Sequence, residues 1–360
     1  MIRRLRPRLA VCLAAVLVVA CGQHGAVPPP ASTTTGLLPP GVPTEGSRPP
    51  DTGLPPAAEP LQGPPLPPEG LIGRTIPVGH APEGVVVDTQ TRIVAVATRD
   101  PNELVLIDAV SGDITSRVPL PGRVRHVQLA APGGPVLVPV ESANSLVRVD
   151  LPRGPAGPPI VTGTEPHDAA AASNGTVFVG NEHGGTVAVV RGEHIVKVFT
   201  DSVQPAGIAP VGIAMGVLDV RKNDLTVYDA DRLTIVGSTP AGAGPTHLVA
   251  DRHGRMIAAD TRGDAVRVFT PLPAPREVAS IAQPGGPYGI AYDTARDRLW
   301  VASSGTNEVI GYDVSEPNPR QVQRFPTVQN PYSLGVDSDT GRLFVAGVSG
   351  GVVQVIDTAS

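Results

Sequence analysis

A unit of about forty residues recurs seven times between Pro82 and the C-terminus, and this repeat limits the folds open to the chain. Each copy opens with a proline or an arginine before a short, largely apolar segment. The openers are Pro82, Arg125, Pro166, Pro205, Pro245, Pro287 and Pro331. They lie 43, 41, 39, 40, 42 and 44 residues apart, which is enough for four short strands and too little for helical crossovers. The repeat therefore predicts an all-β chain, a seven-bladed β-propeller of four-stranded antiparallel sheets.

Alternating apolar residues mark the strands inside each unit. Arg92–Ala97 in the first copy and Arg298–Ala302 in the sixth show the period of two that is typical of β-structure. Asn and Gly best tolerate positive φ, so we expect a left-handed turn residue before the third strand, where every copy has one of the two. These residues are Asn102, Asn144, Gly184, Asn223, Gly263, Asn307 and Gly351. An aspartate at the end of the first strand is expected to cap the next turn in four copies, at Asp88, Asp251, Asp293 and Asp337.

The seventh unit is too short to supply its own fourth strand. Only three residues follow Val352–Asp357. The segment Arg74–Gly79 resembles the fourth-strand segment Ser116–Gly122, and it precedes the first opener just as that segment precedes the second. We therefore expect the N-terminal strand to complete the last blade, which would close the ring and leave only short, protected sheet edges.

The repeat also carries a family resemblance. Its pattern is Pro-x-x-x-x-x-Asp, then Leu-Trp/Phe-Val-Ala, then Asn-x-Val-x-Val-x-Asp, and it is clearest at 287–313 and 331–357. This pattern resembles the Tyr-Val-Thr-Asn-type β-propeller repeat of YncE-like bacterial proteins. The resemblance implies the fold and leaves the function open. Trp300 is the lone tryptophan, which argues against the repeated tryptophan docking motifs of quinoprotein dehydrogenases.

The N-terminus has the features of a bacterial export signal. Four arginines lie within Met1–Arg8, and the apolar run Leu9–Ala20 is too short to span a membrane. Val18–Cys21 resembles the lipobox of bacterial lipoproteins, which implies a signal peptide at 1–20, cleavage before Cys21 and a diacylglyceryl group with palmitate-type acyl chains on its sulfur. The alternative is an ordinary secretory signal. The composition, rich in Ala, Gly, Pro, Val and Arg, suggests a high-GC organism such as an actinobacterium.

A proline-rich linker follows the lipobox. Fifteen prolines lie between Gly22 and Gly70, with almost no apolar periodicity. Such a segment cannot bury a core, so we expect 21–70 to be a disordered, extended linker between the lipidated cysteine and a propeller formed by 71–360. The linker would hold the propeller at the outer face of the cytoplasmic membrane, in the cell envelope.

Cysteine usage and charge exclude several functions. Cys12 would leave with the signal peptide and Cys21 would carry lipid, so the folded domain would have no thiol for a disulfide, a metal or catalysis. Loss of four arginines with residues 1–20 takes the formal net charge from −5 to −9. An acidic surface repels phosphate backbones, and aromatic residues make up only 3% of the chain, so no nucleic-acid partner is expected.

Polar residues of several units are expected to meet at one mouth of the central channel. Inner strands of a propeller begin around one mouth and second strands end there. The candidates for ligand contact are His126, His167, Asp168, His247, Arg99, Glu141 and Asp260. His126, His167 and His247 are the candidates for a divalent metal, and the carboxylates for acid and base catalysis. Polar side chains at a wet mouth also arise without any chemistry, and the sequence has no compact metal or catalytic motif.

Two classes of function therefore remain open. The first is a lipid-anchored, monomeric binding or scaffold module that holds an envelope protein or a small ligand. The second is an extracytoplasmic metal-dependent lyase or hydrolase, because some propeller lyases resemble this arrangement of His and acidic residues. The absence of a compact catalytic motif favours the first, while the ligand and any cofactor stay unidentified.

Overall fold

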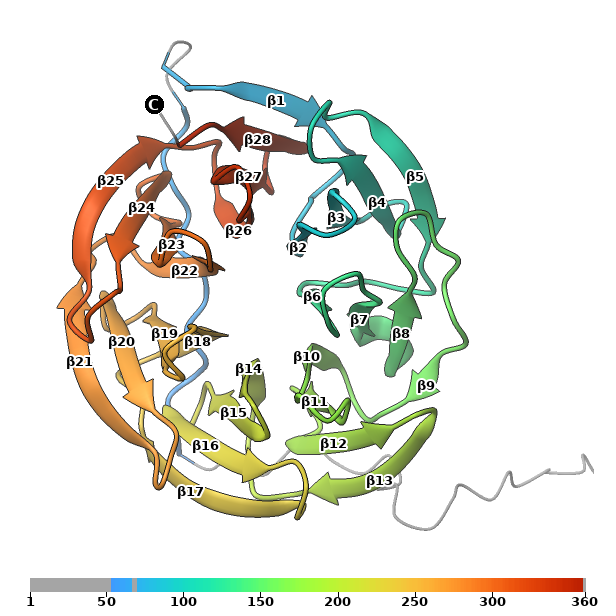
Figure 1. Cartoon of the computed structure of the whole chain (residues 1–360), viewed down its shortest axis with the longest axis vertical. Helices are drawn as coiled ribbons and strands as arrows, with labels where there is room; N and C mark the ends of the chain where they lie inside the picture. The colour runs from blue at the N-terminus through green and yellow to red at the C-terminus, as the bar shows by residue number, and fades with distance from the viewer. Residues whose placement is uncertain (1–52, 67–69, 359–360) are drawn as a thin grey trace, which may run out of the picture. The chain divides into compact units, whose positions relative to one another are not determined.

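The computed structural model describes residues 53–66 and 70–358, and these residues form the predicted seven-bladed β-propeller. Seven four-stranded antiparallel sheets stand around a central axis (Figure 1). One 3-10 turn, η1 (Glu141–Ala143), interrupts the strands of the described region. None of the helical segments described is long and apolar enough to cross a membrane.

Each blade begins with an inner strand beside the axis. The inner strands are β2 (Val85–Asp88), β6 (Gln128–Leu129), β10 (Pro166–Ala171), β14 (Pro205–Val211), β18 (Pro245–Ala250), β22 (Pro287–Asp293) and β26 (Pro331–Asp337). The second strands are β3 (Ile93–Thr98), β7 (Val136–Val140), β11 (Val177–Asn181), β15 (Ala214–Asp219), β19 (Met256–Asp260), β23 (Arg298–Ser303) and β27 (Arg342–Gly347). Blades 1 to 7 are named in this order.

The third and fourth strands complete each blade toward the rim. The third strands are β4 (Glu103–Asp108), β8 (Ser145–Val149), β12 (Thr186–Arg191), β16 (Asp224–Asp229), β20 (Ala265–Thr270), β24 (Glu308–Asp313) and β28 (Val352–Ile356). The fourth strands are β5 (Ile114–Pro119), β9 (Ile160–Val161), β13 (His194–Phe199), β17 (Thr234–Pro240), β21 (Arg276–Ala282), β25 (Arg320–Pro326) and, for blade 7, β1 (Arg74–Pro77).

The core lies between the blades. All six residues of β3 are buried, whereas β5 buries only Val118. Blade 1 packs on blade 2 through Leu106 of one sheet and Val138 and Val149 of the next, with similar apolar layers at the other interfaces. Small and branched side chains dominate these layers because both faces of the second and third strands are covered.

Blade 7 is assembled from both ends of the repeat region. Its strand order is β1-β28-β27-β26, with Arg74 opposite Val355 and Pro77 opposite Val352. The pairing continues past the strand, where Val78 donates its N–H to the carbonyl of Gly351 at 3.0 Å. The first and last strands of the propeller are therefore hydrogen-bonded neighbours.

The predicted left-handed turn residue stands at the expected position in four copies and one or two positions away in the other three. Asn144, Asn223, Asn307 and Gly351 have positive φ, as expected. In the three other copies a neighbouring residue takes the left-handed conformation: Asp100, Gly185 or Asp264. The first-strand aspartates cap the following turns, as when Asp293 accepts the N–H of Ala295 at 3.0 Å.

Residues 53–66, which we name the strap, follow a fixed path across the propeller face that carries the openers (blue in Figure 1). Side chains of blades 4 to 7 hydrogen-bond the backbone of the strap. The pairs are Arg221 with Leu54 and Pro55, Arg262 with Pro56, Ser304 with Leu61, Asn330 with Gly63, and Asn307 with Pro64.

The ordered strap differs from the disorder expected for 21–70, and glycines on the propeller explain the difference. A Cβ atom on Gly244 would lie 2.7 Å from Ala58 Cβ, and one on Gly286 would lie 2.8 Å from Leu61 Cγ. The missing side chains leave a shallow track for an extended segment that has no core of its own. Proline-rich backbone fits this track because its carbonyls are free to accept hydrogen bonds.

Candidate functional site

Three histidines from different blades meet at the axis, as the phase of the repeat predicted. His126 of blade 2, His167 of blade 3 and His247 of blade 5 have ring centroids 5.0 to 6.3 Å apart. The rings of His126 and His167 are parallel, and that of His247 stands edge-on to both. Each follows the opener of its blade, so the starts of the inner strands set their positions.

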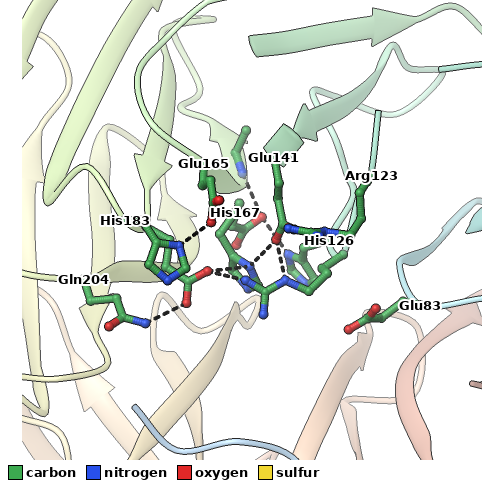
Figure 2. A network of polar contacts seen from close by, with 12 residues as sticks. Glu83, Arg123, His126, Glu141, Glu165, His167, His183 and Gln204 are labelled. Atoms are coloured by element: carbon green, nitrogen blue, oxygen red, sulfur yellow. Dashed lines mark hydrogen bonds and ion pairs between the residues drawn. The ribbon is translucent and has the colours of Figure 1, made fainter. Parts of the chain in front are cut away.

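A network of charged side chains surrounds the histidines (Figure 2). Arg125 contacts the carboxylates of both Glu141 and Glu182. His167 Nδ1 lies 3.4 Å from an oxygen of each carboxylate. Arg123 adds a second guanidinium, 2.8 Å from Glu141. We call Arg125, Glu141, His167 and Glu182 the charged cluster.

Glu141, His167 and Glu182 of the charged cluster are buried and Arg125 is partly buried, and the members shift one another's pKa values. Burial by itself would raise the pKa of Glu141, but His167 and Arg125 lower it below its usual range, and the same balance lowers the pKa of Glu182. Burial and Arg125 oppose protonation of His167, yet Glu182 and Glu141 raise its pKa. The favoured state is therefore two carboxylates held by a guanidinium and an imidazolium.

A metal ion shared by the three histidines, which the sequence suggested, does not match this geometry. In the described part of the chain, the group with ligand atoms within 4.8 Å of one another is Glu141, His167 and Glu182. The three imidazoles stack by their faces and edges, and His126 and His167 already direct Nδ1 at carboxylates. The guanidinium of Arg125 holds the place that a cation would take between Glu141 and Glu182.

Asp168, another predicted residue, fixes His126. Its Oδ1 lies 2.7 Å from His126 Nδ1, and Gln128 donates to both of its oxygens at 2.9 Å. The N–H of Ile208 donates to Oδ2 at 2.8 Å. Burial of Asp168 opposes ionisation, but His126 and the N–H of Ile208 lower its pKa. Asp168 therefore links the inner strands of blades 2, 3 and 4.

Arg99 and Asp260, which were also predicted for the site, form ion pairs outside the charged cluster. Arg99 pairs with Glu83 near the cluster, and burial raises the pKa of Glu83 despite that pairing. Asp260 lies outside the site, which corrects the expectation that it would share a ligand with the histidines. Its carboxylate accepts the N–H of Gly244 at 2.8 Å and pairs with Arg267 at 2.8 Å, so it is used within blade 5.

Arg123, Arg125 and Glu83 are charged members of the site that sequence reasoning missed. Arg125 stands where the six other copies have proline, so it appeared to be a weak opener. The replacement of a turn-forming proline by an ionisable residue, followed by a histidine, was the available signal. Glu83 likewise directly follows an opener, Pro82.

A chamber of about 310 Å³ extends along the axis beyond the histidines. Its walls are inner strands, with residues such as Val85, Leu248 and Ile290 whose side chains pack between the blades. His126 and His247 stand at the end near the openers. His247 is 5% exposed, and its Nδ1 has no hydrogen-bond partner among the described residues. Burial and the neighbouring cations lower the pKa of His247, so the ring is neutral.

The strap lies over the same end of the channel. Ala57, Ala58 and Glu59 border a void of about 20 Å³ that His167 and His247 also line. His247 thus separates this small void from the chamber. A molecule in the chamber would meet His247 from one side, while the strap covers the other.

Comparison with known proteins supports the fold. No family model and no curated protein matches the chain. Among solved structures, virginiamycin B lyase from Staphylococcus aureus has a TM-score of 0.64 at 16% identity, covering 78% of this chain and 98% of its own. A chain of Kuenenia stuttgartiensis hydrazine synthase gives 0.63 at 16% identity, covering 78% and 96%. A chain of the mitotic checkpoint complex gives 0.70 at 11%, covering 82% and 97%. At these identities the likeness extends to the propeller fold alone.

Proposed function

We propose that this chain is an exported, lipid-anchored β-propeller of the cell envelope that binds a small molecule in its central channel. The observation that carries this proposal is the meeting of His126, His167 and His247 at one end of a chamber of about 310 Å³. A concave space into which a few polar side chains converge is a common form of small-molecule site. A small ligand is favoured over a protein partner because the strap covers the rim beside this end.

The location is proposed from the N-terminal sequence. An apolar run followed by Val18–Cys21 supports export and lipidation of Cys21, with the protein held as a monomer at the outer face of the cytoplasmic membrane. The repeat supports membership of the YncE-like group and the composition an actinobacterial source. Cell fractionation tests the anchor: Cys21→Ser should move the protein from the membrane to the soluble fraction. Retention of the variant in the membrane would contradict lipid anchoring.

A thermal-shift screen tests the binding function. Any compound that binds the folded chain and not the unfolded chain must raise the melting temperature. The matched variant is Ala250→Phe, which adds a ring to the chamber wall. A compound that stabilises the natural sequence and not this variant occupies the chamber. If a broad library of small molecules stabilises neither protein, the proposed function is wrong.

The alternative is a metal-dependent lyase or hydrolase. Glu141, His167 and Glu182 favour it, because their ligand atoms lie within 4.8 Å of one another. The propeller fold is shared with virginiamycin B lyase, which is itself a lyase. Arg125 weighs against it, since the guanidinium already neutralises both carboxylates. Stabilisation by Mg²⁺, Mn²⁺ or Zn²⁺ that is lost in Glu182→Gln would support the alternative.

A further inference from the structure

The inner strands leave one edge of every blade unpaired along the channel. Each inner strand lies at the end of its sheet, as in the order β2-β3-β4-β5, and the seven stand around the axis (Figure 1). In an antiparallel pair, alternate residues turn their N–H and C=O groups away from the partner strand. Such an edge carries a row of free donors and acceptors, so rows of this kind border the channel.

Two ladder contacts show which residues turn these groups to the axis. Asp251 donates its N–H to the carbonyl of Arg255 in its own blade at 3.0 Å, so the groups of the preceding residue, Ala250, point away from the second strand. Ala130 donates in the same way within blade 2 at 2.9 Å, which turns the groups of Leu129 to the axis. Both Ala250 and Leu129 line the chamber.

A proline in blade 4 supports this assignment. Pro210 lies within β14, pairs with Met215 of β15 and lines the chamber. A proline has no N–H, and inside a sheet it is tolerated where the missing N–H would face away from the ladder. The free edge at Pro210 therefore faces the chamber, as it does at Ala250 and Leu129.

Nearer the histidines, the axis-facing groups are used between blades. The N–H of Val85 donates to Ser333 of blade 7 at 3.0 Å, and that of Ile208 donates to Asp168 of blade 3 at 2.8 Å. The N–H of Ala250 has no such partner among the described residues. The groups free to meet a ligand therefore lie in the part of the chamber that is remote from the histidines.

Backbone forms much of the chamber wall. Val85, Leu248 and Ile290 direct their side chains into three different core layers between the blades. Gly289 and Gly335 also line the chamber and have no side chain to cover their peptide groups. A ligand in the chamber would therefore meet N–H and C=O groups in alternation.

The lining residues limit the ligand to a neutral one. None of the described residues that line the chamber is Asp, Glu, Lys or Arg. His126 is paired with Asp168, and burial keeps the ring of His247 neutral by lowering its pKa. A charged ligand would be buried without an opposite charge, which is unfavourable.

The same wall favours hydroxyl groups over apolar ones. A hydroxyl both donates and accepts hydrogen bonds, so it matches a wall that alternates N–H and C=O. An apolar molecule would remove these peptide groups from water without replacing their hydrogen bonds. A cavity of about 150 Å³ holds benzene in another protein. The chamber of about 310 Å³ therefore admits one or two six-membered rings.

We propose that the chamber binds a neutral, polyhydroxylated molecule through the free backbone groups of the inner strands. This inference rests on the proposed binding function and specifies its ligand class. The hydroxyls would contact edge groups such as those of Ala250 and Leu129.

Isothermal titration at pH 7 tests this ligand class, with xylitol, D-glucose and maltose as neutral polyols. The chain from residue 21 with Cys21→Ser keeps the strap and the propeller and carries no lipid. At least one polyol should bind, about thirtyfold more tightly than cyclohexanol, which corresponds to two hydrogen bonds. D-gluconate, a charged polyol, should show no binding. The proposal is overturned if no polyol binds, or if cyclohexanol or gluconate binds as tightly as the best polyol.

A reciprocal pair of proline variants tests whether the strand edges make the contacts. Ala250→Pro removes an N–H that the ladder does not use, and should weaken binding of the best polyol about fivefold through loss of one hydrogen bond. Pro210→Ala adds an N–H on the neighbouring blade and should not weaken binding. Unchanged affinity in folded Ala250→Pro protein, or weaker binding in folded Pro210→Ala protein, would refute recognition by the edges.

Two further variants assign the binding to the chamber. Ala250→Phe should abolish it, whereas His183→Phe, at an exposed position outside the chamber, should leave it unchanged. Polyol binding that persists in folded Ala250→Phe protein would place the probe elsewhere and contradict the proposal.

The same measurements separate this inference from the broader function. If no polyol binds but other compounds stabilise the chain and fail to stabilise Ala250→Phe, the ligand class is wrong and the binding function stands. If no compound stabilises the chain, both proposals fail.

Discussion

Two neighbouring histidines of the channel have pKa values displaced in opposite directions. Against the effect of burial, Glu182 and Glu141 raise the pKa of His167, whereas burial and nearby cations lower that of His247. Folding therefore favours the protonated form of one ring and the neutral form of the other. Both displacements make the stability of the protein depend on pH near neutrality.

We expect each histidine to destabilise the fold on a different side of about pH 6.5, the usual pKa of histidine. Above that value the folded chain keeps a proton on His167 that the unfolded chain has lost, so stability falls with rising pH until the folded pKa is passed. Below it the unfolded chain protonates His247 and the folded chain does not, so stability falls with falling pH. Each slope reaches at most about 1.4 kcal/mol per pH unit.

Urea unfolding measured from about pH 5 to about pH 9 checks both slopes. His167→Gln should remove the loss of stability above pH 6.5, and His247→Phe the loss below it. His183→Gln, at an exposed position, serves as the control and should retain both. An alkaline slope that survives unchanged in His167→Gln would show that this ring is not held protonated.

The residues of the site differ in how far the sequence could predict them. The three histidines could be placed together because each lies one or two residues after a repeat opener, and the openers lie at or just before the inner strands at the same mouth. The ion pairs could not be predicted, because Arg125 of blade 2 contacts Glu182 of blade 3 across an interface whose side-chain directions the repeat does not specify. The same limit explains Asp260, whose carboxylate turns toward its own blade.

The strap is the element that covers the histidine end of the channel. Residues 53–66 cover the mouth through hydrogen bonds to their backbone and through contacts at glycines of the propeller. Glycines such as Gly286 appeared in the sequence as turn residues, and nothing in the repeat distinguished those that also leave room for a distant segment. The order of the strap was unpredictable for this reason.

We expect release of the strap to expose the histidine end of the channel. Thr246 borders the void beneath Ala57–Glu59, so Thr246→Cys places a thiol under the strap. In the chain from residue 21 with Cys21→Ser this would be the single thiol. Adding Ala58→Arg and Gly63→Val, which enlarge two buried strap positions, should speed its labelling by a small maleimide roughly thirtyfold, because about two contacts near 1 kcal/mol each are lost.

Two controls accompany the labelling measurement. Pro65→Ala changes an exposed strap position and should leave the rate unaltered. Ala250→Cys, at the far part of the chamber wall, should react at the same rate whether or not the strap is released. Equal labelling of Thr246→Cys with an intact and a released strap would mean that the strap does not restrict access.

At the scale of the whole molecule, the fold followed from the repeat period and the alternation of apolar residues, which are properties of the chain as a whole. In blade 7, β1 pairs with β28. The stability of the ring therefore depends on the pairing of two strands that lie more than 270 residues apart in sequence. Ile76 is the buried residue of that strand. Its side chain packs with Phe344 and Val353 in the layer between blades 7 and 1.

We expect Ile76→Ala to destabilise the entire propeller by about 2–5 kcal/mol, in a single cooperative transition, because it weakens the pairing that joins the two ends of the ring. Differential scanning calorimetry measures the effect. Thr75→Ala, its exposed neighbour, should change stability by no more than about 0.5 kcal/mol. A separate low-temperature transition in Ile76→Ala, with the main transition unmoved, would mean that β1 is an appendage of an independently stable ring.

The order of the strap contacts also has a mechanical consequence. Tension applied to the chain before Gly53 would act first on Leu54 and Pro55 at Arg221, and then on Pro56 at Arg262. The contacts with Ser304 and Asn330 would bear load only after these had opened. Loaded in this sequence, the strap peels one hydrogen bond at a time instead of shearing all of them together, which needs less force. Tension on the N-terminal side of the strap would thus uncover the histidine end of the channel before the blades came under load.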